Sequence, residues 1–223
     1  MRLRDRAQHR HVFVLDLGHV SMRLPRPSRF PSPEGSCFQI RAMIDRHVLP
    51  SDSGVCPKAT LFTHSLGSAY AVWMLKVAPE RLAGLVLCDP ISILLQHPTV
   101  AYNFIYRKSL AATEMFFEWI AREPGIAVTL GRHFHWFQNI FPFIAEVDST
   151  ASAGFFPQGL PATIFLSERD CIVPSARIVE VLRRGKKDNV DVYMMPKLDH
   201  GGFVFHKTWL DKVVHTLVEL DIE

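Results

Sequence analysis

The sequence predicts an α/β fold in which a mostly parallel sheet carries helices on both faces. An apolar, β-branched run at 59–62 turns sharply at 63–67 into a helix-forming stretch at 69–76. Strand-length apolar runs at 81–88, 161–166 and 190–195 are separated by longer stretches, several of helical composition. Such alternation is typical of parallel strands joined by helical crossovers. The 223 residues suit a single domain with one sizeable core, spanning 1–223.

Several function classes are disfavoured by composition. A net charge of +3 is small and its basic residues are scattered, so we expect no nucleic-acid partner. No apolar run reaches the roughly 18 residues of a membrane span, and no signal peptide precedes the first expected strand. The basic stretch Met1–Arg10 is expected to be a solvated leader. Four cysteines without C-x-x-C spacing favour free thiols and a cytoplasmic location. Nothing in the sequence indicates an oligomeric state.

The elements follow in chain order. A strand is expected over Val12–Leu17, then a Pro/Ser-rich loop over Pro25–Gly35, a helix over Cys37–His47 and a turn at Ser51–Gly54. The longest insertion, Ile91–Ala153, is rich in aromatic residues and contains candidate helices at 100–110, 112–120 and 126–137. Apolar positions at helical spacing predict a last helix over Thr208–Leu220.

The sharp turn at 63–67 carries the strongest functional signal. Ser65 lies at its apex, between a strand and a helix, as in the G-x-S-x-G nucleophile elbow. Small residues are favoured two before and two after the serine, because strand and helix backbones approach closely there. Gly67 meets this requirement, whereas Thr63 occupies the first glycine position. His64, beside the serine, is as typical of a packing and orienting residue as of a catalytic one.

Two further polar residues follow strands in the order Ser65, Asp170, His200. A serine hydroxyl becomes a good nucleophile when a base accepts its proton, and His200 has the side chain best suited to that task. Asp170 would hold the imidazole in the required tautomer. The amide of Leu66, at the start of the following helix, would donate to a developing oxyanion. Asp89, also at a strand end, is an alternative acid.

These motifs resemble the α/β-hydrolase superfamily, whose triad residues occur in the same chain order. The resemblance extends from about residue 12 to the C-terminus without pointing to one subfamily. It implies that Val12–Leu17 is the family's fourth strand and Arg81–Cys88 its sixth, and that the insertion at about 91–153 forms a cap over the active site.

The resemblance also implies missing parts. Strands one to three have no counterpart upstream, so an N-terminally truncated fold without the family's oxyanion loop is expected. In the alternative interpretation, Val12–Gly18 is the third strand and Leu17-Gly18-His19 forms that loop. The interval from Asp16 to Ser65 suits one helix and no additional strand, which favours the first interpretation.

The sequence therefore predicts a serine hydrolase that cleaves a carboxylic ester or related acyl bond, with a small-molecule or lipid-like acyl substrate. Serine at the elbow disfavours haloalkane and epoxide chemistry, which uses a carboxylate nucleophile. Thioesterase, acyltransferase, lyase and carbon–carbon hydrolase activities share the triad and stay open. The alternative is a catalytically inactive fragment or binding protein. No cofactor is implied, and His133-x-His135 lacks a third ligand at recognisable spacing, so no metal is expected.

Overall fold

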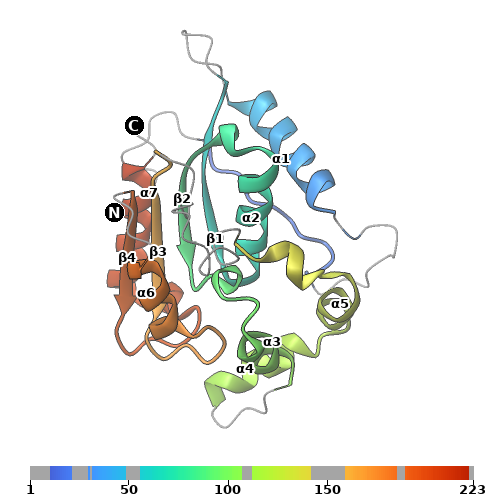
Figure 1. Ribbon diagram of the computed structural model, residues 1–223, viewed down its shortest axis with the longest axis vertical. Helices are drawn as coiled ribbons and strands as arrows, with labels where there is room; N and C mark the ends of the chain where they lie inside the picture. The colour runs from blue at the N-terminus through green and yellow to red at the C-terminus, as the bar shows by residue number, and fades with distance from the viewer. Residues whose placement is uncertain are drawn as a thin grey trace.

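A four-stranded parallel sheet forms the centre of the computed structural model, which describes residues 11–21, 30, 32–48, 56–106, 112–141, 159–184 and 189–220 (Figure 1). The strands are β1 (Ala59–His64), β2 (Leu82–Cys88), β3 (Ala162–Ser167) and β4 (Val190–Met195). They lie in the order β1-β2-β3-β4, and every neighbouring pair is parallel. The predicted parallel sheet and its four downstream strands are therefore confirmed.

Helices cover both faces of the sheet. Alternate residues of β2 and β3, such as Leu85 and Ile164, belong to a core that includes buried side chains of three helices, α1 (Pro33–His47), α2 (Ser68–Val77) and α6 (Ser175–Arg184). The intervening residues, such as Val86 and Phe165, pack with α7 (Lys207–Glu219). Because both faces are buried, β2 and β3 are almost uniformly apolar, as parallel central strands require.

Helix α1 is defined by local signals at its start. The Ser32 hydroxyl accepts a hydrogen bond from Gly35 N at 3.0 Å, and Pro33 occupies the first turn. Its buried residues Cys37, Ile40 and Ile44 recur at helical spacing and face α2. The predicted helix over Cys37–His47 is confirmed, four residues longer at its start.

The segment between β2 and β3 contains α3 (Pro98–Ile105), α4 (Ala112–Ala121) and α5 (Pro124–Val128). In Figure 1 these helices lie beyond the carboxyl ends of the strands. A continuous helix over 126–137 was expected, and that expectation is wrong. The chain instead forms a π-helical turn, Thr129–His133, and a 3-10 turn, Trp136–Asn139. The π turn closes with Phe134 N bonded to Thr129 O, which moves the following backbone out of α-helical register.

Some expectations lie outside the described residues. They are the solvated leader 1–10, most of the loop 25–35, the whole turn 51–54, positions 107–110 of the expected helix 100–110, and insertion residues 142–153. The first helix of the insertion is confirmed over 100–105; α3 begins two residues earlier than expected and ends before Tyr106. The second, expected over 112–120, is confirmed as α4.

The strand expected over Val12–Leu17 is not present. Residues 11–17 have no strand assignment, and Val12 and Val14 are 71% and 89% exposed. A central strand would be buried on both faces and bonded to a neighbour. This segment instead packs against the end of α1, where the Phe13 and His47 rings lie 5.5 Å apart. Its β-branched residues favour an extended chain, but no strand partner is available among the described residues.

The described helices include none that is both long enough and apolar enough to cross a bilayer.

Truncating a core residue should test the sheet as the centre of stability. Leu87 is fully buried in β2. Leu87→Ala would leave a cavity there, which should lower the free energy of unfolding by about 2–5 kcal/mol. Urea denaturation measures this loss. Phe38→Ala removes a larger side chain that is 72% exposed, and its effect should stay within about 0.5 kcal/mol. Equal losses in the two variants would contradict this description of the core.

Candidate active site

Three of the predicted site residues meet at the carboxyl edge of the sheet. Ser65 follows β1, Asp170 follows β3 and His200 follows β4. Parallel strands end at the same edge, so residues distant in sequence can meet there. Ser65 adopts a positive φ of 50°, which is uncommon outside glycine and turns the chain abruptly from β1 toward α2. This is the strained strand-to-helix turn that the sequence predicted.

A hydrogen-bonded chain joins the three side chains. Ser65 Oγ lies 2.9 Å from His200 Nε2, and His200 Nδ1 lies 2.7 Å from Asp170 Oδ2. An ionised carboxylate can only accept, so Nδ1 carries the proton and Nε2 is left to accept from the serine hydroxyl. In such an arrangement the imidazole can accept the hydroxyl proton while the carboxylate orients the ring.

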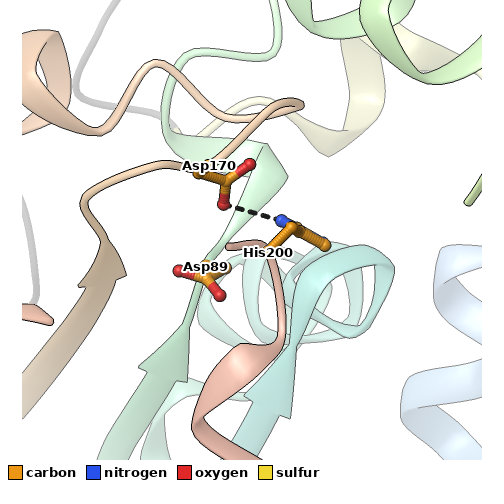
Figure 2. A group of neighbouring side chains, drawn as sticks. All are labelled: Asp89, Asp170 and His200. Carbon is orange, nitrogen blue, oxygen red and sulfur yellow. Dashed lines mark hydrogen bonds and ion pairs between the residues drawn. The ribbon is translucent and has the colours of Figure 1, made fainter. Parts of the chain in front are cut away.

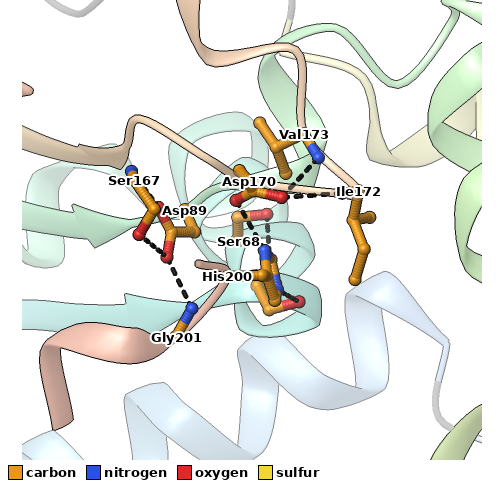
Figure 3. Close-up of polar contacts among 9 residues, drawn as sticks. Ser68, Asp89, Ser167, Asp170, Ile172, Val173, His200 and Gly201 are labelled. Carbon is orange, nitrogen blue, oxygen red and sulfur yellow. Dashed lines mark hydrogen bonds and ion pairs between the residues drawn. The ribbon is translucent and has the colours of Figure 1, made fainter. Parts of the chain in front are cut away.

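Burial and hydrogen bonds fix the side chains of Asp170 and His200. The His200 and Asp170 side chains are 1% and 0% exposed. Asp170 Oδ1 accepts from Ile172 N and Val173 N at 2.8 and 2.7 Å, which holds the other oxygen toward the imidazole (Figure 3). Burial alone would lower the pKa of His200, but the charge and hydrogen bond of Asp170 and the charge of Asp89 outweigh it, and the pKa is raised.

The turn around Ser65 is braced by two further serines that the sequence did not single out. Ser68 Oγ donates to Ser65 O at 2.7 Å and also accepts from Ser92 N at 3.1 Å. Ser68 is fully buried at the start of α2, so these bonds fix the backbone of Ser65. The position of Ser68, three residues after Ser65, could have indicated its role from the sequence. Nothing in the sequence around Ser92 indicated a role for that residue.

The small residues flanking Ser65 are needed less than expected. A Cβ at Gly67 would lie 3.4 Å from Thr63 Cβ, an ordinary contact distance. The turn therefore accommodates Thr63 in place of glycine, although its buried hydroxyl has no hydrogen-bond partner among the described residues. Leu66 lies at the start of the helical turn that leads into α2, where backbone N–H groups lack an intrahelical acceptor.

An apolar pocket adjoins Ser65. Ser65 and Leu66 form one wall, and the loop after Asp170 contributes Ile172. The segment between β2 and β3 supplies the remaining lining residues, which are Ile91, Val100, Phe104, Leu130 and Trp136. The Trp136 ring is held by a hydrogen bond from Nε1 to Leu130 O at 3.2 Å and by edge contact with Phe134. From the sequence, this segment was expected only as an aromatic-rich part of the cap at about 91–153.

A second buried carboxylate lies beside this chain. Ligand atoms of Asp89, Asp170 and His200 all lie within 4.8 Å of one another (Figure 2). Three such residues could hold a metal in principle. Here the Asp170 oxygens are bonded to His200, Ile172 and Val173, and both Asp89 oxygens accept hydrogen bonds. These donors occupy three of the four lone-pair sites of each carboxylate, so the carboxylates are held mainly by backbone and side-chain hydrogen bonds.

Comparison with known proteins places this geometry in a known fold. No family model matches the sequence, and no curated protein sequence matches it. Solved structures do match. A proline iminopeptidase-related protein from Thermus thermophilus is 14% identical, with a TM-score of 0.56 over 89% of this chain and 74% of that one. The metagenomic carboxylesterase EstE1 is 16% identical, with a TM-score of 0.54 over 87% of this chain and 64% of that one.

The description of a third structural neighbour names the fold. An α/β-hydrolase enzyme from a lagoon-sediment metagenome is 15% identical, with a TM-score of 0.50 over 84% of this chain and 69% of that one. This chain has an α/β-hydrolase fold. The predicted fold class and the resemblance stated from the motifs are thereby confirmed, at identities that establish the fold alone.

In this α/β-hydrolase fold, His64 differs from the neighbouring polar residues in its hydrogen bonding. Its ring lies 5.1 Å from the ring of His200, and its Nε2 has no hydrogen-bond partner among the described residues. Burial, followed by the positive charge that His200 can carry, lowers the pKa of His64 to about 4, although Asp170 acts in the opposite sense. His64 is therefore neutral near pH 7 and does not compete with His200 for the proton.

The low pKa of His64 should make stability depend on pH. Its folded pKa lies below the usual value of 6.5, so its contribution is fully present above that value and is lost as the pH falls toward about 4. From about pH 7.5 to pH 5 the wild type should lose roughly 1–2 kcal/mol more unfolding free energy than His64→Gln. Urea denaturation at both pH values measures the difference. His206→Gln, at an exposed position, should keep the wild-type slope, and a parallel slope for His64→Gln would contradict the assignment.

Proposed function

We propose that this protein is a serine hydrolase that cleaves a carboxylic ester or related acyl bond through an acyl-enzyme intermediate. The single observation that supports this best is the hydrogen-bonded chain from Ser65 through His200 to Asp170, with distances of 2.9 and 2.7 Å, beside an apolar pocket. The fold adds support, because a structural neighbour is a carboxylesterase.

The reaction follows from the protons on this chain. His200 Nε2 accepts the hydroxyl proton as Ser65 Oγ attacks the carbonyl carbon, and Asp170 stabilises the imidazolium that forms. The negative charge that develops on the carbonyl oxygen is met by the Leu66 N–H at the start of the helical turn. His200 then protonates the leaving alcohol. A water molecule, deprotonated by the same imidazole, releases the acid and restores Ser65.

The pocket supports an apolar acyl group as substrate. Apart from Ser65, the lining residues are aliphatic or aromatic, and most come from the segment after β2. Burying an acyl chain there would remove apolar surface from water at about 25 cal/mol per Å². Residues 91–153 would then act as a cap that shapes the pocket, within a single domain of 1–223. The same triad serves thioesterases, acyltransferases and lyases, and the ester class is proposed because the pocket contains no charged side chain.

A second candidate is a binding protein that retains the site without turnover. It is favoured by one observation: residues 11–17 form no strand, so no strand leads into Leu17-Gly18-His19 as the family's oxyanion loop would require. Losing one oxyanion donor costs about a hundred- to a thousand-fold in rate. The loop at 17–20 contacts the pocket wall, since Thr129 donates to His19 O at 3.0 Å beside Leu130, and its amides are candidates for the second donor.

Active-site labelling should separate the two candidates. A fluorophosphonate probe reacts with an activated serine, so the wild type should be labelled at Ser65, as located by mass spectrometry of the peptides. Ser65→Ala and His200→Ala should abolish labelling, and Asp170→Asn should slow it by about 10³–10⁴-fold because the imidazole loses its orienting acceptor.

Controls keep this result interpretable. Ser53→Ala, which changes a serine other than Ser65, should be labelled like the wild type, and circular dichroism should show that each variant folds. A folded wild type that resists the probe would rule out the hydrolase and support the binding protein. Labelling that survives in His200→Ala would contradict the assigned base.

The pocket should set the preference for acyl length. On p-nitrophenyl esters, kcat/KM should rise from acetyl to longer straight chains, and faster turnover of the acetyl ester would contradict an apolar acyl site. Trp136→Ala widens the pocket and removes apolar contact with short chains, so the ratio of long-chain to short-chain kcat/KM should increase about tenfold. Phe137→Ala, at a neighbouring 70% exposed side chain that does not line the pocket, should leave the ratio within about twofold.

A further inference from the structure

The loop after β4, which carries His200, must span a long distance and therefore needs hydrogen-bond partners along its path. β4 lies three strands away from β1, or roughly 14 Å at the usual spacing of neighbouring strands. His200 follows β4, yet its ring contacts Ser65 at the end of β1. The loop after β4 therefore crosses the ends of β3 and β2, and its backbone needs hydrogen-bond partners along that path.

The end of β3 supplies the first partners. Arg169 N donates to Leu198 O at 2.9 Å, and the Glu168 carboxylate accepts from Lys197 N at 2.8 Å. These bonds join the loops after β3 and β4 before the chain reaches His200.

The end of β2 supplies the next partner, the carboxylate of Asp89. This residue follows the last residue of β2, has a positive φ of 44° and has no exposed surface. Its Oδ2 accepts from Gly201 N at 2.8 Å, directly after His200 (Figure 3). Ser167, the last residue of β3, donates its backbone N–H to Oδ1 at 2.7 Å and its hydroxyl to Oδ2 at 2.9 Å. One side chain thus joins the ends of β2, β3 and the loop after β4.

Gly201 is held from its other side as well. Its φ is 70°, and a Cβ there would lie 3.1 Å from two atoms of the His64 ring. The peptide that follows His200 is therefore confined between the Asp89 carboxylate and the His64 imidazole. A side chain at this position would strain the backbone and press on the His64 ring.

The hydrogen bonds distinguish the roles of the two acids. Asp170 contacts the imidazole itself at 2.7 Å, whereas both Asp89 oxygens are bonded to Ser167 and Gly201. Asp89 is therefore placed to act on His200 through the backbone and through its charge. From the sequence, Asp89 was interpreted only as an alternative to Asp170 as the acid.

We propose that Asp89 is a positioning residue for His200, holding the Gly201 amide so that the imidazole reaches Ser65, and that its negative charge favours the protonated imidazole. The proposal rests on the serine-hydrolase function proposed above.

The charged and titratable groups around His200 set the direction of the electrostatic effect. Asp170, after β3, and Asp89, after β2, both raise the pKa of His200. His64, at the end of β1, opposes protonation of its neighbour when it is itself charged, but its pKa of about 4 keeps it neutral over the working range. The Cys88 thiol beside Asp89 is buried, and its pKa is raised well above the usual value, so it stays neutral too. Burial and the charge of Asp170 raise the pKa of Asp89 itself to about 6, so Asp89 is charged mainly above that pH. In that range, removing the charge of Asp89 should lower the pKa of His200.

The test is the rate of fluorophosphonate labelling as a function of pH, because labelling requires neutral His200 and needs no known substrate. In Asp89→Asn the plateau rate should fall at least tenfold, since the amide cannot accept from all three donors. The acidic midpoint should move down by about one pH unit, because a charge near the imidazole is removed. Ser167→Ala is the matched control: it removes one hydrogen bond to Asp89 but leaves the charge and the Gly201 contact. Its midpoint should stay within about 0.2 units of the wild type.

Each outcome decides a separate point. A wild type without labelling refutes the proposed function itself. A labelled wild type with an unchanged midpoint and plateau in folded Asp89→Asn overturns the positioning role alone. A loss of rate with no midpoint shift, shared by Ser167→Ala, would reveal a purely structural carboxylate and also overturn it. Asp89→Ser is the second variant if Asp89→Asn does not fold, judged by the same two quantities. If neither folds, Asp89 is a folding determinant and the proposal is wrong.

Discussion

The parallel pairing of β1 to β4 is the constraint on which the candidate active site depends. Parallel strands bring all their carboxyl ends to one edge, so three residues from three different loops can form one hydrogen-bonded chain there. Ser65 and His200 are 135 positions apart in the chain. Their contact is set by the strand order, and the loops need only cross the ends of the intervening strands.

That crossing explains why the polar residues at the edge are so densely bonded. A loop that leaves its strand and passes over two others exposes peptide groups that no regular element satisfies. The buried carboxylates meet this need: Asp170 accepts two amides of its own loop, and Asp89 accepts amides from β3 and from the loop after β4. The proposed acid–base chemistry and the support of the loops thus depend on the same few buried side chains.

The sequence predicted what local chemistry determines. The strands β1 to β4, the turn at Ser65 and the residues Asp170 and His200 were all found from apolar runs followed by polar residues, and the structure brings the three site residues together. It could not predict the bond from Gly201 to Asp89, which joins residues 112 positions apart and depends on strand order. The strand expected over Val12–Leu17 failed for a related reason, because β-propensity fixes an extended backbone but not the neighbour that a sheet requires. The pocket residues were also beyond prediction, since the helix expected over 126–137 is interrupted by a π turn.

The left-handed backbone at Ser65 restricts how this site could evolve. A φ of 50° is tolerated by unbranched side chains and by glycine, asparagine and aspartate, but crowds a side chain that branches at Cβ. Threonine carries the same hydroxyl group and differs by one methyl, yet its branched Cβ makes it a poor replacement at this turn. Cysteine and aspartate fit the backbone and carry a different reactive group. Under the proposed mechanism, descent from this chain would therefore change the reacting group more easily than it would exchange one alcohol for another.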